Sequence, residues 1–168
     1  KNSKDKQEKA YLLNYFLESF RGTLFRQTMF AEFEQKAHEM AATGESLTSQ
    51  SLCSIYKKLN EDYFGPDTVT DPEIQYEWER IPHFYTPFYV YQYAIGFSAA
   101  IAISRKIFNG EPGILEGYRK FLSGGCCDTP IELLKLAGVD MSYTGPMEEA
   151  LKFFEELLNE FEELVHRF

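Results

Sequence analysis

Apolar side chains recur every three to four residues through the first part of the chain, from about Asp5 to Ala42. This spacing places them on one face of an α-helix. The positions that carry it are Tyr11, Leu12, Tyr15, Phe16, Phe20, Leu24, Phe25, Met29, Phe33 and Ala37. Gly22 lies inside the pattern without shifting its register, and Gly44 follows it as a residue type that often ends helices. The pattern predicts a long N-terminal helix that is bent or interrupted at Gly22.

Two arginines, Arg21 and Arg26, lie among these apolar positions. An arginine at a mostly apolar helix position is often paired with a carboxylate, and Glu32 or Glu34 from the neighbouring turns could be that partner. We therefore expect structural ion pairs within this helix.

A second helix is predicted from Ser49 to about Tyr63. Thr48 is a suitable N-cap, and Gly65 lies where the helical pattern stops. The side chains expected to face inward are Leu52, Ile55, Tyr56 and Leu59. A short helix should follow from Pro72, because proline suits the first position of a helix.

Three further helices are predicted near the C-terminus. One covers Ile114 to Leu122, and a brief one from Pro130 to Leu136 opens with a capping box formed by Thr129 and Glu132. The last begins after Thr144 and has a strongly acidic outer face, which is most simply a solvated one. Its predicted buried stripe consists of Leu151, Phe154, Leu157, Leu158, Phe161, Leu164 and Val165.

No stretch alternates with the period of a β-strand, and no internal repeat is evident. The predicted fold class is therefore all-α, with the helices packed as a bundle. At 168 residues the chain is expected to form a single all-helical segment, residues 1–168.

The stretch Arg80–Gly96 concentrates polar aromatic side chains, with one histidine and four tyrosines. Pro82 and Pro87 disfavour the α region for the residues before them, so Ile81 and Thr86 should be extended. The second proline suits the first turn of a helix. We therefore expect the histidine and the first tyrosine on a loop, and the remaining tyrosines on a helix.

On that helix, Tyr89, Tyr93 and Gly96 are spaced i, i+4 and i+7 and should share one face. Two phenol groups above a residue without a side chain would form a notch with hydroxyls at its rim. Glycine within a helix costs about 1 kcal/mol relative to alanine. Close approach of another backbone or of a ligand usually offsets that cost. Tyr91 should point away from this face.

Two interpretations of these aromatic residues are open at this point. Aromatic side chains at helical spacing usually fill a hydrophobic core, and this holds for each tyrosine taken alone. His83 differs because it is expected on a loop between prolines, and loops held by rigid elements often carry function.

The composition of the chain argues against several classes of function. The net charge is −9, which argues against nucleic acid or an anionic membrane as a main partner, since both require a basic surface. No purely apolar run is long enough to span a bilayer, and the N-terminus lacks the apolar region of a signal peptide. The three cysteines form no disulfide framework, so we expect a reducing, cytoplasmic setting. The chain opens on Lys1, as if within a longer protein.

Three partial motifs do not amount to metal or redox sites. His38 begins a sequence like His-Glu-x-x-His, but Ala42 replaces the second histidine. Glu163 and His166 have the Glu-x-x-His spacing of di-iron bundles without the second copy that such sites need. Cys126 and its neighbouring cysteine have no further ligands nearby. The residues alone thus indicate a helical domain with a tyrosine-rich pocket, and no metal ligands within this chain.

Several segments resemble the C-terminal part of oligoendopeptidase F, within the thimet-oligopeptidase-like family of zinc metallopeptidases. They are Trp78–Tyr85, Phe88–Gly96, Phe25–Glu34, Tyr63–Gly65 and Glu132–Met141. The resemblance implies an all-α segment of a zincin-type catalytic domain, in an enzyme that cleaves short peptides inside a deep channel. The zinc ligands of that family, His-Glu-x-x-His and a downstream glutamate, would precede this chain.

The resemblance also implies roles for residues of the tyrosine-rich stretch. His83, Tyr89 and Tyr93 would be catalytic, as donors to the substrate carbonyl and the oxyanion, with Tyr85 as a third candidate donor. Tyr85 would also contact substrate, and the cost of a glycine within a helix indicates Gly96 as a second contact. We expect the parent protein to be a zinc oligoendopeptidase and this chain alone to bind no zinc and be inactive. Its partners would be the oligopeptide substrate, the missing N-terminal part, and another copy through an exposed apolar face. The alternative is a non-catalytic helical module whose aromatic groove binds a peptide or partner helix.

Overall fold

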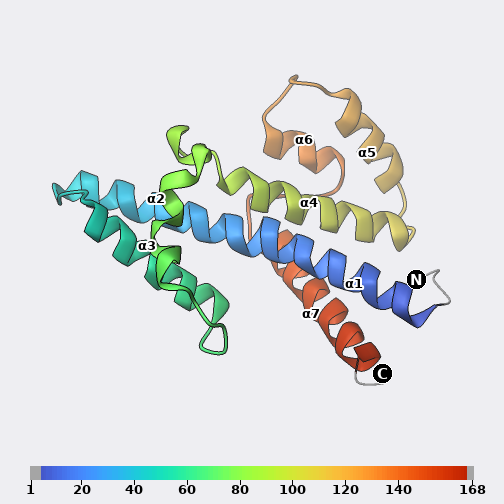
Figure 1. Ribbon diagram of the computed structural model, residues 1–168. Helices are drawn as coiled ribbons and strands as arrows, with labels where there is room; N and C mark the ends of the chain where they lie inside the picture. Colours follow the sequence, from blue (N-terminus) through green and yellow to red (C-terminus); the bar gives the residue numbers. More distant parts are fainter. Residues whose placement is uncertain (1–4, 166–168) are drawn as a thin grey trace. The chain divides into compact units, whose positions relative to one another are not determined.

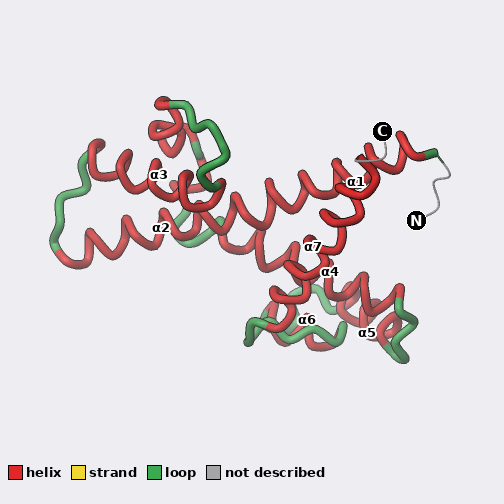
Figure 2. The backbone as a smooth tube through the Cα atoms, turned by 90° about the horizontal axis from the view of Figure 1, so that it is seen from below, coloured by secondary structure: helices red, strands yellow, loops and turns green. Residues whose placement is uncertain are grey.

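The computed structural model describes residues 5–165, and these residues contain helices, turns and loops but no strand (Figure 2). The all-α prediction is confirmed. The α-helices are α1 (Lys6–Phe20), α2 (Arg26–Thr43), α3 (Ser49–Phe64), α4 (Tyr91–Phe108), α5 (Ile114–Ser123), α6 (Pro130–Leu136) and α7 (Gly145–Val165). A π-helix, η1 (Arg21–Phe25), and two 3₁₀ helices, η2 (Pro72–Arg80) and η3 (Pro82–Tyr85), complete the set.

The predicted N-terminal helix is present, and it is interrupted at Gly22 as predicted. The π-helical turn η1 contains Gly22 and separates α1 from α2. Gly44 caps α2 in the left-handed region, with φ of 82°. Thr48 caps α3 through a reciprocal capping box with Ser51. At α6, by contrast, Thr129 accepts from the Glu132 amide, but the Glu132 carboxylate lies 2.6 Å from Lys135 Nζ instead of closing the predicted box.

Two boundaries in the central stretch differ from the prediction. The expected loop is η3, because Pro82 fixes a helical φ and one 3₁₀ turn forms before the extended Thr86. The expected helix starts at Tyr91 instead of at Pro87, so Tyr89 lies ahead of it. The cause is Phe88, whose φ of 57° breaks the right-handed path. Ile81 and Thr86 are extended as predicted, with ψ of 102° and 99°.

The chain divides into two compact units, which we call the central unit (Gly22–Ala94) and the terminal unit (Lys1–Arg21 with Ile95–Phe168). In the central unit, α3 packs against both α2 and η2 (Figure 1). The core between them consists of Met29, Phe30, Phe33, Tyr56, Leu59, Ile81 and Val90. The prediction of a single segment concerns domain organisation and stays a prediction.

Glu77, on η2, is a buried carboxylate that joins three elements of the central unit. Its two oxygens accept from the Tyr56 hydroxyl on α3 and from Arg26 on α2, each at 2.7 Å, and also from Arg80. Burial alone would raise the pKa of Glu77, but the hydrogen bonds from Tyr56 and Arg26 outweigh it, and the net shift is downward.

The expected partners of the two helix arginines were wrong. Arg26 pairs with Glu77, which is 51 residues away, and Arg21, the first residue of η1, pairs with Glu18 in the last turn of α1. Sequence distance hid the first pair, because only the tertiary fold brings η2 against α2.

In the terminal unit, α1 lies along α7 (Figure 1). Five phenylalanines from α1, α4 and α7 form an aromatic cluster, namely Phe16, Phe20, Phe97, Phe153 and Phe154. The helices α5 and α6 pack closely because Gly117 has no side chain: a Cβ there would collide with the Leu136 carbonyl oxygen.

The predicted buried stripe of α7 is only partly buried. Leu157 is buried, and Phe154, Phe161 and Leu164 are half-buried. Leu151, Leu158 and Val165 are 40%, 36% and 44% exposed. These last three recur every seven residues and therefore form an apolar row along one side of the helix that the described residues cover only in part. Among the described helices, none combines the length and the apolar character that crossing a bilayer demands.

Candidate functional site

His83, Tyr89 and Tyr93 form one cluster of three rings, although they come from three different local structures. His83 and Tyr89 stack with their ring centroids 5.6 Å apart and their planes 11° from parallel. The Tyr93 ring stands edge-on to both, at 5.6 Å from His83 and 5.5 Å from Tyr89. The structure thus brings together the three residues predicted to be catalytic.

Hydrogen bonds link the polar atoms of this three-ring cluster. The Tyr93 hydroxyl lies 3.3 Å from His83 Nε2 and donates to the Tyr89 hydroxyl at 3.2 Å. With the proton on Nε2, His83 donates to Tyr93 in turn, and the series ends at the Tyr89 O–H, which can then donate to a ligand. Each donor in such a series polarises the next.

Packing beneath the cluster holds its three members in place. His83 is on η3, whose next residue, Phe84, contacts Phe33 of α2 with ring centroids 5.2 Å apart. Tyr89 is followed by Val90, which is fully buried. Tyr93 lies in the first turn of α4. The polar rings are therefore carried by a segment whose apolar residues are anchored in the core of the central unit.

The cluster itself is accessible. Tyr89 and Tyr93 are 37% and 36% exposed, and His83 is half-buried. These residues therefore do not fill the core, which was the alternative interpretation of their spacing. The hydrogen bond with Tyr89 raises the pKa of the Tyr93 hydroxyl above its usual value, so this phenol remains a neutral proton donor at physiological pH.

Tyr85 and Gly96, the two predicted substrate contacts, are outside the three-ring cluster. Tyr85 ends η3 and is 83% exposed. Gly96 lies within α4, and a Cβ added there would meet no atom within 4 Å. The close approach of another backbone, one of the two predicted reasons for a glycine here, is therefore not seen at this position. Tyr91 is exposed as well.

Glu34 and Phe88 are site-supporting residues that the sequence did not identify. Glu34 is buried on α2, and its Oε1 accepts from the Phe88 amide at 2.7 Å. A carboxylate directly after the buried Phe33 in an apolar pattern was a signal that this side chain had to find a donor. The identity of that donor, 54 residues later, was not recoverable from spacing.

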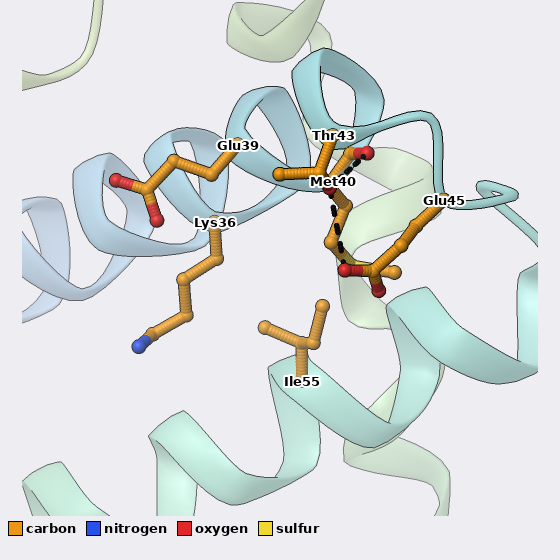
Figure 3. A pocket seen from close by; sticks show the side chains of 6 residues that line it. All are labelled: Lys36, Glu39, Met40, Thr43, Glu45 and Ile55. Carbon is orange, nitrogen blue, oxygen red and sulfur yellow. Dashed lines mark hydrogen bonds between the residues drawn. The ribbon is translucent and has the colours of Figure 1, made fainter.

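Two grooves of the central unit lie elsewhere, along α2 and α3. One has a volume of about 380 Å³ and is lined by residues that include Lys36 and Glu39 of α2 and Ile55 of α3 (Figure 3). A second, of about 430 Å³, adjoins it beside Tyr63. Neither is lined by His83, Tyr89 or Tyr93. Beside the first groove the Thr43 hydroxyl lies 3.3 Å from Glu45 Oε1, but its shorter bond, at 2.9 Å, is to the Met40 carbonyl oxygen of its own helix. We therefore assign the candidate chemistry to the three-ring cluster.

Zinc, which the family resemblance implies, has no matching ligand set here. Within residues 5–165 no three histidine, cysteine, aspartate or glutamate side chains come together in a way that could hold a metal ion. His166, half of one partial motif, lies outside the described residues. The cysteines are free: Cys53 is buried, and Cys126 and Cys127 are exposed.

Comparison with known proteins decides the family. The model described as "Peptidase family M3" matches residues 1–153. The chain belongs to peptidase family M3. Among M3 relatives, the chromosomal oligoendopeptidase F of Lactococcus lactis subsp. cremoris is 50% identical over 167 residues, which are 99% of this chain and 28% of the relative. Oligopeptidase PepF of Bacillus subtilis is 52% identical over 165 residues, 98% of this chain and 24% of the relative.

Solved structures agree with this M3 assignment. The crystal structure of oligoendopeptidase-F from Enterococcus faecium superposes with a TM-score of 0.96 at 50% identity, and the match covers 99% of this chain and 32% of that one. A putative peptidase from Chlamydophila abortus gives a TM-score of 0.89 at 42% identity. The predicted resemblance to oligoendopeptidase F is confirmed. The chain spans between about a quarter and a third of the lengths of these relatives.

Proposed function

We propose that this chain forms part of the cleft of an M3 oligoendopeptidase and supplies the groups that bind the peptide carbonyl during hydrolysis. The observation that carries the proposal is the three-ring cluster, in which an imidazole and two phenols are hydrogen-bonded, accessible and anchored from below. The names of the relatives suggest oligopeptides as substrates. The free cysteines fit a reducing, cytoplasmic setting.

The chemical task of the three-ring cluster is charge stabilisation. When water attacks a peptide bond, negative charge develops on the carbonyl oxygen. Donors already fixed around that position need no reorganisation as the charge forms. The Tyr89 hydroxyl ends the hydrogen-bonded series, so its own hydrogen is available for the substrate oxygen, while Tyr93 and His83 polarise it.

The other parts of the reaction are assigned outside this chain. The described residues contain no ligand set for zinc, so the metal would be held by the remainder of a longer protein. The same remainder would cover the apolar row on α7 and the exposed Tyr11, Leu12 and Tyr15 on α1. Tyr85 and Gly96 are proposed to contact the bound peptide away from the reacting carbonyl.

The proposal is tested with Tyr89→Phe and Tyr93→Phe in the full-length peptidase. Loss of a donor that acts in the transition state should lower kcat by about 10²-fold, with a smaller change in KM. Steady-state cleavage of a quenched fluorogenic peptide measures both constants. Tyr91→Phe is the matched control, because Tyr91 lies between the two tyrosines, is also exposed, and has no place in the cluster. Unchanged kcat in both test variants would remove the cluster from the mechanism.

A further inference from the structure

Phe88 has an unusual backbone conformation directly before one of the proposed catalytic tyrosines. Its φ of 57° lies in the left-handed region, which bulky residues without glycine's freedom rarely adopt. Such a conformation persists only where its surroundings hold it, and it is concentrated at functional sites.

A carboxylate and a ring on one face of α2 hold this residue. Glu34 Oε1 accepts from the Phe88 amide at 2.7 Å, and Glu34 is only 6% exposed. A hydrogen bond from an amide to a buried carboxylate is stronger than one between neutral groups. One helical turn further along, His38 stacks on the Phe88 ring, with centroids 4.6 Å apart and planes 30° from parallel. Backbone and side chain of Phe88 are thus both held from α2.

The turn at Phe88 determines where the next side chain goes. Tyr89 lies between Phe88, held by α2, and Val90, which is fully buried. With both neighbours fixed, the Tyr89 ring lies nearly parallel to the His83 ring, with the two ring centroids 5.6 Å apart. A helix running straight on from Pro87 would carry Tyr89 in a different direction, so the left-handed residue is what brings the phenol to the cluster.

We propose that Glu34 is a positioning residue for Tyr89: by accepting from the Phe88 amide it maintains the left-handed turn that sets the Tyr89 phenol against His83. Phe33, its neighbour on α2, contacts Phe84 beside His83. One turn of α2 therefore supports both sides of the cluster. The catalytic consequence rests on the proposed function, while the turn itself does not.

The test uses substitutions at Glu34 in the full-length peptidase. Glu34→Met keeps the size of a buried side chain and removes the carboxylate acceptor. It should lower kcat by about 10- to 100-fold, the cost of misplacing a catalytic group by about an ångström, with little change in KM. Glu34→Gln retains an oxygen acceptor and should keep most of the activity. Glu39→Met, on an exposed part of the same helix, is the matched control and should behave like the unmodified enzyme.

Rescue and coupling distinguish positioning from a general structural role. Asparagine tolerates the left-handed region far better than phenylalanine. Phe88→Asn added to Glu34→Met should therefore restore part of kcat, which a general loss of stability would not predict. In a Tyr89→Phe background, Glu34→Met should have almost no further effect on kcat, because the group that it positions is already disabled.

The outcomes separate the two proposals. If Tyr89→Phe leaves kcat unchanged, the proposed function of Tyr89 fails. If Tyr89→Phe lowers kcat but Glu34→Met does not, or if the two losses multiply independently, the positioning role of Glu34 is overturned and the proposed function stands. If Glu34→Met does not yield folded protein, the Glu34→Gln enzyme provides the test. The inference is also overturned if Glu34→Gln lowers kcat as much as Tyr89→Phe does and adding Phe88→Asn to Glu34→Gln restores none of it.

Discussion

Two buried carboxylates, Glu34 and Glu77, organise the central unit at the scale of single residues. Each is less than a tenth exposed, and each accepts from a group far away in the sequence. A buried carboxylate without donors would be strongly unfavourable, so its partners are essential to the local structure. Glu34 fixes a backbone amide beside the three-ring cluster, whereas Glu77 fixes side chains from α2 and α3.

Replacing Glu77 should destabilise the folded protein. Glu77→Gln leaves Arg26 without its counter-charge and weakens the bond to Tyr56, at a cost of roughly 1–3 kcal/mol. Thermal unfolding of the full-length protein measures this cost, and the Glu77→Gln variant should have a lower Tm than the unmodified protein. Glu61→Gln, on the exposed side of α3, should leave Tm nearly unchanged.

This contribution of Glu77 should also depend on pH. The folded state lowers its pKa, so the carboxylate stabilises the fold above the unfolded value of about 4.3. The stability is lost as pH falls through the lower folded value. The Tm difference between the unmodified protein and Glu77→Gln should therefore shrink as pH is lowered from 7 towards 3.5. A difference that stays constant would show that the charge of Glu77 is not what stabilises the fold.

At the scale of elements, local signals in the sequence predicted most of the fold. Gly44 and Thr48 mark a helix end and a helix start because a glycine C-cap and a threonine N-cap act within one turn of the chain. Gly22 marked the interruption between α1 and α2, although not its π-helical form. Boundaries that depend on capping groups were therefore accessible from the residues alone.

The elements that carry the candidate site were harder to predict, for a physical reason. The start of α4 is delayed by Phe88, a residue type that does not favour the left-handed region on its own. Its conformation is stabilised by Glu34, which is distant in sequence. Spacing correctly grouped Tyr89 with Tyr93, but for the wrong reason: they meet across a turn and not along one helix face.

At the scale of the whole molecule, exposed apolar side chains mark surfaces that favour contact with another protein surface. Leu151, Leu158 and Val165 form a row on α7, and α1 exposes Tyr11, Leu12 and Tyr15. Because the chain spans about 28% of a relative's length, we propose that this apolar surface contacts the rest of a larger enzyme.

The isolated chain of 168 residues should therefore associate and show no peptidase activity. Multi-angle light scattering would show species larger than a monomer, because the exposed apolar rows would bury one another. Replacing Leu151 and Leu158 by glutamate should shift the distribution towards monomer. Turnover of a fluorogenic peptide together with stoichiometric zinc in the isolated chain would contradict the proposal that the metal site lies elsewhere, and a stable monomer that binds peptides would favour an autonomous binding module.

The central claim is that the three-ring cluster stabilises the tetrahedral oxyanion, and affinity for a tetrahedral mimic tests it most directly. The measurement is the inhibition constant of a phosphinic peptide against the full-length enzyme and its Tyr89→Phe, Tyr93→Phe and Tyr91→Phe variants. If the cluster acts on the transition state, affinity for the mimic should fall in proportion to kcat/KM in the first two variants and remain unchanged in the third. A mimic that binds all four enzymes equally well, while kcat/KM falls in the first two, would contradict the account.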